Sequence, residues 1–380
     1  MTVTEVLPDD TALRLARRSR VLEEMEAADI DVLVVGREGN ARYVSGAPRL
    51  WTAGSRAFGP GCVLVRVSGS VHLLSTWDEG IPDDIPHENL YGISFNAGNF
   101  LKVLQGIEGA GTIRTVATDA MTPSAARLLP KAFPSAQLID GEPLLRRARR
   151  VKTPEEVDAI RASVRIAERA LDEAAATLAP GVTERQLTGV FMQAMASAGV
   201  TTPANQDVAW ITSSQHPWRR ASRDTPAQPG DLVAFEAGVM LRGYVGELGR
   251  THSVDGDVAI DGQLAQRRDE LGDRLLGACR VGAPLSDLLA AYEGAGIPLP
   301  PMPVARGLGL GYDLPLVTPA LPRTAGEQIM EAGMVLAVST FVWQEGIGAV
   351  YTQEPVVVTA TGPVPLSSTP FGDARSTARD

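Results

Sequence analysis

Residues 229–254 read PGDLVAFEAGVMLRGYVGELGRTHSV, and this stretch decides the interpretation of the 380-residue chain. Its two apolar halves, residues 231–240 and 243–254, predict a pair of β-strands folded into a hairpin. A two-residue turn at Leu241-Arg242 would place Glu236 directly opposite Glu247 on one face. Residues paired in this way have Cβ atoms about 4.5–5.5 Å apart, so the stretch predicts two neighbouring carboxylates.

Two carboxylates at such a distance repel each other unless a cation, a hydrogen-bond donor or a shared proton lies between them. One interpretation is a pair of solvated charges on an edge hairpin. The flanking residues Leu232, Phe235 and Leu248 argue against it, because they are too apolar for a hairpin surrounded by water. If repulsion dominates, Gln at either position should leave the melting temperature level or raise it.

The composition excludes several classes of protein. A net charge of −10 argues against a general nucleic-acid binder and against adhesion to an anionic membrane. The two cysteines, Cys62 and Cys279, are too few for a disulfide framework and predict buried thiols in a reducing compartment. No secretory signal and no apolar run of about 18 residues is visible, so we expect a cytoplasmic protein.

The order of predicted elements suggests two domains. Residues 11–28, 102–109 and 123–131 have helical patterns, residues 31–36 and 112–117 read as strands, and residues 60–75 read as a hairpin. This alternation predicts an α/β domain over residues 1–148. Thr153-Pro154-Glu155-Glu156 has the signature of a helix start, and it opens a second domain over residues 149–366. Residues 367–380 read as a polar tail.

The hairpin resembles that of the creatinase/aminopeptidase P superfamily (peptidase family M24), which has the pita-bread fold of methionine and Xaa-Pro aminopeptidases. The matching positions are residues 229–231 (PGD), Gly238, residues 243–244 (GY) and residues 250–251 (RT). Residues 151 onward, including PGVTERQ at 180–186, resemble the same family. The resemblance implies an N-terminal creatinase-like α/β domain followed by a pita-bread α+β domain. In the family, two Asp on the hairpin bridge a dinuclear metal centre, and here both positions hold Glu.

The resemblance also implies where the other metal ligands, a His and two Glu, should lie. Leu308 stands at the His position, in a predicted loop over residues 306–313, and Ser339 and Gln353 stand at the Glu positions. Glu354 beside Gln353 should face the other way by strand alternation. Without an imidazole this set is a poor centre for a transition metal, so we expect neither a metal nor another cofactor.

The first functional hypothesis is a metal-independent hydrolase similar to creatinase, which has this fold and breaks a C–N bond with His and Glu side chains. Its substrate would be a small nitrogenous or peptide-like molecule. Glu236 and Glu247 would share one proton and act as an acid/base pair. Gln353 and Ser339 would orient the substrate, beside Leu308 and Tyr244.

Other candidate residues follow from the resemblance. His216 is the only histidine near a further family histidine, and Arg219 or Arg220 could anchor a substrate carboxylate. Trp51 and Arg56 lie in a segment that resembles the one creatinase-like homodimers insert into the neighbouring subunit's site; a surface loop is the alternative. We therefore expect a homodimer.

Two further hypotheses stay open. The fold also serves as a non-catalytic ligand- or peptide-binding module, and loss of the metal histidines fits that role. The chain could also be an Xaa-Pro-type peptidase with a single remaining metal ion, clamped by Glu236 and Glu247.

Overall fold

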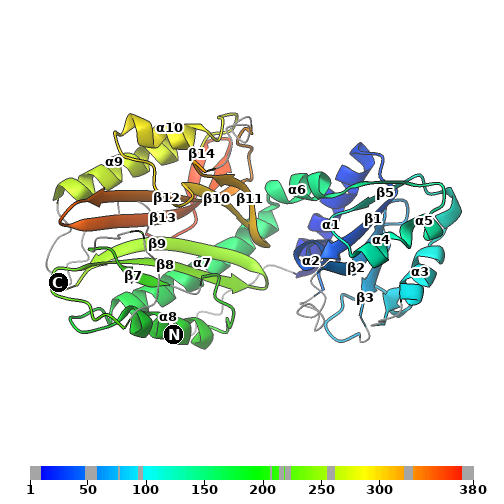
Figure 1. Ribbon diagram of the computed structural model, residues 1–380, viewed down its shortest axis with the longest axis horizontal. Coiled ribbons are helices and arrows are strands. Elements are labelled where there is room, and N and C mark those ends of the chain that lie inside the picture. The colour runs from blue at the N-terminus through cyan, green and yellow to red at the C-terminus, as the bar shows by residue number, and fades with distance from the viewer. Residues whose placement is uncertain are drawn as a thin grey trace. The chain divides into compact units, whose positions relative to one another are not determined.

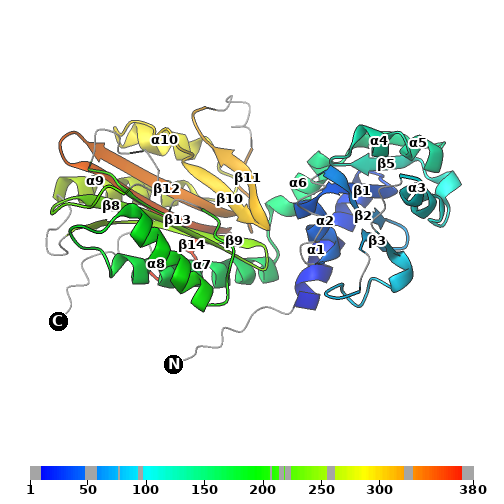
Figure 2. The same ribbon diagram turned by 60° about the horizontal axis from the view of Figure 1, so that its bottom comes forward.

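The computed structural model describes residues 10–47, 58–75, 78–92, 97–205, 208–213, 218, 224–254, 262–320 and 328–369. The chain divides into two compact units, one of residues 8–149 and one formed mainly by residues 150–380. Each unit contains its own β-sheet with helices around it (Figures 1 and 2). This mixed architecture confirms the predicted fold class. No helix within the described ranges is long and apolar enough to cross a bilayer.

The N-terminal unit is built on a six-stranded sheet in the order β4-β3-β2-β1-β5-β6. The strand β1 pairs antiparallel with β2 and parallel with β5, so the sheet is mixed. The strands are β1 (Val32–Arg37), β2 (Phe58–Val65), β3 (Val71–Leu74), β4 (Leu90–Tyr91), β5 (Thr115–Thr118) and β6 (Gln137–Asp140). The helices are α1 (Asp10–Ala27), α2 (Glu38–Ser45), α3 (Ala97–Gln105), α4 (Pro123–Ala126), α5 (Leu129–Ala132) and α6 (Glu142–Arg150), with 3₁₀ turns η1 (His87–Asn89) and η2 (Ala110–Thr112).

The C-terminal unit is built on an eight-stranded antiparallel sheet in the order β11-β10-β12-β13-β9-β8-β7, with β14 paired to β13. Its strands are β7 (Ala209–Ile211), β8 (Leu232–Leu241), β9 (Tyr244–Ser253), β10 (Ala305–Gly309), β11 (Gly311–Val317), β12 (Val335–Gln344), β13 (Gly348–Thr359) and β14 (Gly362–Pro365). Its helices are α7 (Pro154–Ala175), α8 (Glu184–Ser197), α9 (Gly262–Ala278) and α10 (Asp287–Gly294).

Two of these helices begin at capping boxes. The Thr153 hydroxyl accepts a hydrogen bond from the backbone N–H of Glu156, and the backbone N–H of Thr153 donates one to the Glu156 carboxylate, so α7 begins where the sequence predicts. Thr183 and Gln186 make the same reciprocal pair at the start of α8. Because these boxes satisfy backbone donors locally, both helix starts follow from local sequence alone.

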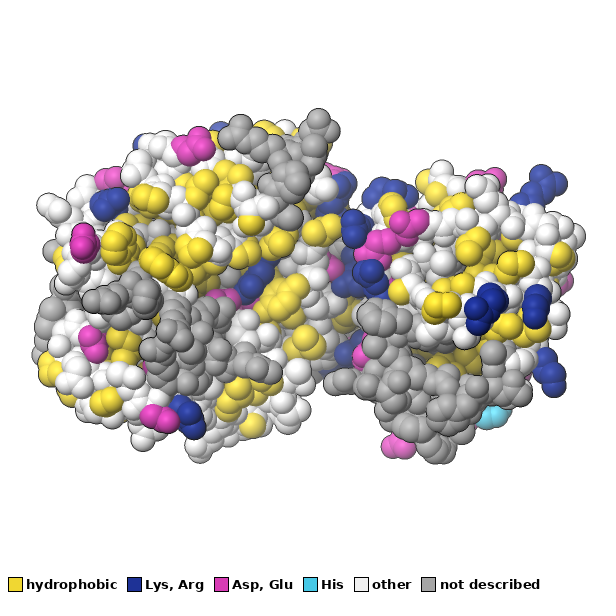
Figure 3. All heavy atoms as spheres, in the orientation of Figure 1, with side chains coloured by type: hydrophobic (Ala, Val, Ile, Leu, Met, Phe, Trp, Pro, Cys, Tyr) yellow, Lys and Arg dark blue, Asp and Glu magenta, His cyan; other side chains and the backbone are white. Residues whose placement is uncertain are grey.

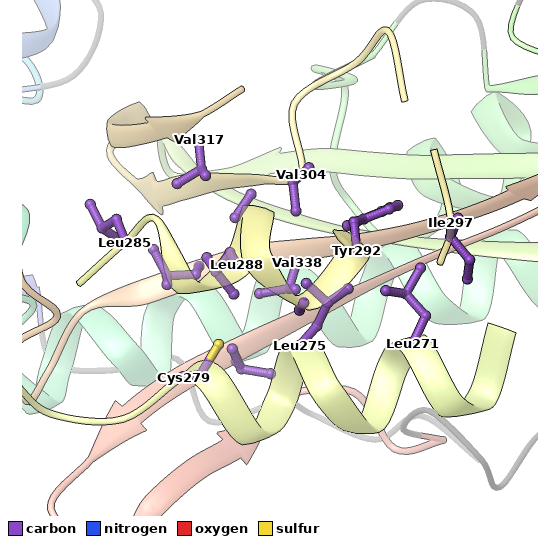
Figure 4. Close-up of a cluster of buried hydrophobic side chains, with 14 of the residues drawn as sticks. Leu271, Leu275, Cys279, Leu285, Leu288, Tyr292, Ile297, Val304, Val317 and Val338 are labelled. Carbon is purple, nitrogen blue, oxygen red and sulfur yellow. The ribbon is translucent and has the colours of Figure 1, made fainter. Parts of the chain in front are cut away.

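The helices α7 to α10, which the structure describes in this unit, cover one face of the sheet. The helices α7 and α8 share a core with β8 and β9, and α9 and α10 share a second core with β12 and β13 (Figure 4). The buried ion pair Arg250–Glu354 links the two cores, because Arg250 lies opposite Phe235 and Glu354 lies opposite Val338. Glu354 thus points to the helix side, which confirms the alternation predicted for it.

The register of the β8–β9 hairpin differs from the prediction. The turn is Arg242-Gly243, with φ of 49° and 89°, and Leu241 pairs with Tyr244. Two central residues with positive φ match the right-handed twist of the flanking strands, and Gly adopts this conformation without strain. Glu236 therefore lies opposite Gly249, not opposite Glu247. The shift is two residues, so both glutamates keep the same face.

A second difference concerns residues 306–313, expected as a loop. They form the hairpin of β10 and β11, in which Leu308 pairs with Tyr312. Gly311, with φ of 95°, allows the chain to reverse direction next to Leu310. Arg306 and Tyr312 therefore sit on strands of the sheet and not on a mobile connection.

Candidate active site

The site is organised by one row of residues across four strands. Ser339 pairs with Gln353, Gln353 with Gly249, and Gly249 with Glu236. Paired residues project to the same face, so Ser339, Gln353 and Glu236 share the face opposite the helices. Glu247 precedes Gly249 by two residues and joins them there. Each of these four side-chain-bearing positions is at most 3% exposed.

The guanidinium of Arg306 contacts both carboxylates. Its Nε lies 2.5 Å from Oε1 of Glu247 and its Nη2 lies 2.6 Å from Oε2 of the same residue. The same Nη2 also donates to Oε1 of Glu236. The contact with Glu247 is bidentate, the strongest arrangement of an arginine with a carboxylate. The cation that two neighbouring carboxylates require is thus supplied by the chain itself.

Short side chains allow Arg306 to reach the glutamates. Arg306 on β10 pairs with Ala337 on β12, which in turn pairs with Pro355 on β13. These two residues lie between Arg306 and β9 in the sheet, and neither carries a long side chain. The arginine can therefore extend across the sheet to Glu247, 59 residues away in sequence.

Tyr312 and Asn205 complete the polar cluster. The Tyr312 hydroxyl lies 2.9 Å from Oε2 of Glu247 and 3.1 Å from Oδ1 of Asn205, so it can donate a hydrogen bond to either oxygen. The amide of Asn205 donates a long hydrogen bond of 3.4 Å to Oε1 of Glu236. The Arg306 guanidinium lies over the Tyr312 ring, 4.5 Å from its centroid, which adds a cation–π contact.

Glycine at position 238 leaves room for Asn205. A Cβ atom at Gly238 would lie 2.9 Å from the Cβ of Ala204 and 3.0 Å from Nδ2 of Asn205. Both distances are shorter than ordinary van der Waals contact. This explains why a glycine faces Glu247 across the hairpin.

Burial and charge set the protonation of the cluster. Burial raises the pKa of Glu247, and the nearby Glu236 adds to this rise, while Arg306 and Tyr312 oppose it. Burial disfavours the charge of Arg306, but Glu247 and Glu236 outweigh it and hold the pKa of the guanidinium above its usual value. Burial, together with Glu247, also raises the pKa of Tyr312. Near neutral pH the arginine is therefore charged and the tyrosine is neutral.

Gln353 presents an unsatisfied acceptor beside this cluster. Its Nε2 donates to the Ser339 hydroxyl at 3.3 Å, whereas its buried Oε1 has no hydrogen-bond partner within the described part of the chain. A buried acceptor without a partner is costly, so it is expected to have one in the working state. The N–H group of a bound molecule would satisfy it.

The helix side of the sheet holds this row in place. Arg250 donates to the carbonyl oxygens of Gly249 at 2.8 Å and of Gln353 at 2.9 Å. Tyr292 on α10 donates to the carbonyl oxygen of Ser339 at 2.8 Å. Residues 367–369, expected to begin a polar tail, are also bound: Thr369 accepts a hydrogen bond from Arg250 through its carbonyl oxygen. The backbone under the site is therefore fixed from behind.

The structure brings together Glu236, Glu247, Ser339 and Gln353, and it places Leu308 beside them as a buried apolar residue. Tyr244 does not join them, so its assignment as a substrate contact is wrong. It lies three residues before Glu247 and faces the helices, where its hydroxyl donates to Glu156 on α7 at 3.0 Å. The other candidates lie outside the described residues: Trp51, Arg56, His216, Arg219 and Arg220.

Sequence reasoning missed Arg306, Tyr312 and Asn205. The signal for Arg306 was present, because VARGLGLGYD at residues 304–313 places one arginine in an apolar, glycine-rich stretch. Two carboxylates on buried strands need a positive partner, and this arginine was the obvious candidate once the histidine was absent.

On the face shown in Figure 3, basic and acidic side chains are visible in the middle of the C-terminal unit among hydrophobic ones.

Comparison with known protein families agrees with this architecture. Residues 158–360, more than half of the chain, match the family model described as metallopeptidase family M24. The chain belongs to family M24. Residues 17–151 match the creatinase/prolidase N-terminal domain.

Relatives of this M24 protein carry several activities in their names. It is 23% identical to a creatinase of Bacillus sp. (strain B-0618) over 94% of this chain and 90% of that protein. It is 22% identical to an Xaa-Pro dipeptidase of Pyrococcus horikoshii, over 92% and 96% of the two chains. Among solved structures, the prolidase from Pyrococcus horikoshii OT3 superposes with a TM-score of 0.73 at 17% identity, covering 92% of this chain and 97% of that one. This likeness shows the fold.

The donor set of this M24 protein does not fit the metal centre that the family name implies. Of the described residues at this site, only Glu236 and Glu247 offer charged oxygens, and both already contact the Arg306 guanidinium. Leu308 has no donor atom, and Ser339 and Gln353 are neutral. No group of three or more His, Cys, Asp and Glu side chains in the described ranges could hold a metal ion. The Arg306 guanidinium occupies the position between the glutamates that a divalent ion would require, and its positive charge would repel that ion.

Proposed function

We propose that this M24 protein is a metal-independent hydrolase, similar to creatinase, that acts on a C–N bond or a proton of a small nitrogenous or peptide-like substrate. The observation that carries the proposal is the contact of Arg306 with both carboxylates. This guanidinium supplies the positive charge that a metal would supply in a metallopeptidase. The cluster is therefore compatible with acid/base chemistry by side chains.

The contacts of the two glutamates differ and suggest different roles. Glu247 engages Arg306 through both oxygens and Tyr312 through one, whereas Glu236 meets Arg306 through Oε1. We assign proton transfer to Glu236 and anchoring of Arg306 to Glu247. In a hydrolysis, Glu236 would take a proton from the attacking water as its oxygen bonds to carbon. It would return that proton to the nitrogen that leaves.

Gln353 and Ser339 would orient the substrate. The unpartnered Oε1 of Gln353 can accept a hydrogen bond from a substrate N–H, and its amide is held by the Ser339 hydroxyl. A nitrogenous or peptide-like group carries such a donor next to the bond to be broken. Leu308 would contribute an apolar wall.

The remaining parts of the proposal rest on the family resemblance. Arg219 or Arg220 would bind a substrate carboxylate, and His216 would contact the substrate. Trp51 and Arg56 would enter the partner's site in a homodimer.

The two buried free cysteines support a cytoplasmic location.

The test is turnover without metal. Chelator-treated protein is incubated with N-acyl amino acids and Xaa-Pro dipeptides, and products are followed by mass spectrometry. We expect turnover to survive EDTA and to be lost in Glu236→Gln. The matched control is Glu345→Gln, the same chemical change at an exposed turn. Loss of turnover to the chelator, with recovery on adding Mn²⁺, Co²⁺ or Zn²⁺, would refute the proposal.

The same ion pair also favours a second candidate, a non-catalytic ligand-binding module. A site whose acids are neutralised by its own arginine can bind a polar ligand without turning it over. This candidate predicts that peptides or small amides raise the melting temperature while no product forms. Product formation that depends on Glu236 would exclude it.

A further inference from the structure

The Arg306 side chain occupies a position that a free cation could occupy if the arginine were absent. It enters from β10, whereas the carboxylates belong to β8 and β9, and its charged end makes the ion pairs. We propose that Glu236 and Glu247 form a guanidinium-binding site that the chain fills with its own Arg306. A protein lacking this side chain would bind a guanidinium ion from solution at the same place.

The geometry suits a flat cation with several N–H donors. Three carboxylate oxygens receive N–H groups from one plane: Oε1 and Oε2 of Glu247 and Oε1 of Glu236. The Tyr312 ring lies beneath that plane at 4.5 Å, the stacking that guanidinium groups favour. An ammonium ion would match neither the fork nor the ring as well.

A divalent metal ion is a poorer occupant of the vacated position. Such ions need six or more oxygen ligands, or an imidazole for transition metals, and the cluster offers two carboxylates with neutral neighbours. The guanidinium needs only the oxygens that Arg306 already uses. The ligand of the vacated site is therefore a guanidinium ion and not a divalent metal.

The same argument makes Arg306 a specificity residue in the intact protein. Because it fills the cation position, the protein should discriminate against guanidinium and amidinium ligands at the carboxylate pair. This inference concerns binding and does not require that the protein turns over any substrate. Failure of the proposed enzyme activity would leave it untouched.

The experiment compares thermal melts of the full chain, wild type and Arg306→Ala, in millimolar guanidinium chloride. We expect guanidinium at about ten times its dissociation constant to raise the melting temperature of Arg306→Ala by roughly 2–4 °C, and to leave the wild type unchanged. Sodium chloride and urea at equal concentrations control for ionic strength and for a neutral molecule of similar shape. Arg146→Ala, at an exposed arginine, controls for general effects on the protein.

Two variants decide between outcomes. Arg306→Ala combined with Glu247→Gln should lose the guanidinium effect, because the bidentate acceptor is gone. An equal shift in both variants, or a shift with MnCl₂ and none with guanidinium, would overturn the proposal. If Arg306→Ala does not fold, Arg306→Ser, which also leaves the cation position empty, takes its place, and the same shift with guanidinium is expected.

A measurement on the wild type is independent of any variant's folding. In a ¹⁵N spectrum, the Nε–H of Arg306 should exchange slowly with water because it is held against Glu247. The Nε–H signal of Arg306 is assigned by its disappearance from the spectrum of Arg306→Lys. If the Nε–H signal that disappears in Arg306→Lys exchanges fast with water in the wild type, the guanidinium is not held by the glutamates and the proposal is refuted.

Discussion

Arg306 and Glu247 form a bidentate ion pair whose two N–O distances are 2.5 and 2.6 Å, although 59 residues separate them in sequence. Glu247 is fully buried and the arginine side chain is 20% exposed. The pair joins β10 to β9 across the middle of the sheet. Its partner carboxylate, Glu236, comes from the neighbouring strand, so one guanidinium links the hairpins β10–β11 and β8–β9.

Replacing Arg306 by Met should destabilise the protein strongly. It would leave two buried carboxylates without a cation, and breaking a buried pair in this way costs about 3–5 kcal/mol. Urea unfolding at pH 7 measures the loss. Arg146→Met is the matched control, because Arg146 pairs with Glu142 on the surface and such pairs contribute at most about 1 kcal/mol. Equal stability of the two variants would show that Arg306 is not essential to the fold.

The glutamates should differ in their effect on stability. Glu247→Gln removes the bidentate partner of Arg306 and should cost on the order of 3 kcal/mol, while Glu236→Gln weakens an ion pair made through one oxygen and should cost less. The sequence alone predicted the opposite sign, since relief of repulsion would keep the melting temperature level or raise it. Thermal melts of both variants distinguish these views. A rise in either variant would mean that repulsion outweighs the arginine.

The fold followed from the sequence because its signals are local. Alternating apolar residues, the capping boxes at Thr153 and Thr183, and turn glycines act over a few residues. The hairpin register was wrong by two because Gly243 was assigned to the second strand, whereas it is the second turn residue, with φ of 89° beside Arg242 at 49°. Positive φ is rare for residues other than Gly, Asn and Asp, so Gly243 was the local signal for the observed turn.

The site was only half predictable for a different reason. Glu236, Glu247, Ser339 and Gln353 could be located because the family resemblance supplies their positions. Arg306 has no counterpart among the family's metal ligands, and its contacts span 59 and 70 residues. Only charge balance between buried groups could have connected it to the glutamates. Long-range pairing of this kind appears once the strand order is known.

Both cysteines should be inert in the folded protein. Burial raises the pKa of Cys62 to about 12, and burial likewise raises the pKa of Cys279 to about 12. The thiolate is the reactive form, and at pH 8 both thiols are protonated and covered. A thiol reagent should titrate no cysteine in native buffer and two in urea. Rapid reaction of either residue in native buffer would show that its unit opens readily.

His252 should make the protein less stable in acid. Burial, helped by the charge of Arg250, lowers the pKa of His252 to about 4, and its Nε2 has no hydrogen-bond partner in the described part of the chain. As the pH is lowered, the imidazole of His252 is protonated near pH 6.5 in the unfolded chain, before it is protonated in the folded protein. Stability therefore falls as the pH drops from 6.5 to about 4, by at most about 3 kcal/mol from this residue.

The matched variants are His252→Gln and His87→Gln. His252→Gln removes the titrating group, so its unfolding free energy should fall less than that of the wild type between pH 7 and pH 4.5. His87 is exposed and paired with Asp78, which raises the pKa of His87. Its contribution is present at low pH and is lost as the pH rises, so His87→Gln should not flatten the fall. Urea unfolding at three pH values tests both variants. An identical pH dependence of the wild type and His252→Gln would mean that His252 is protonated in the folded protein with little cost.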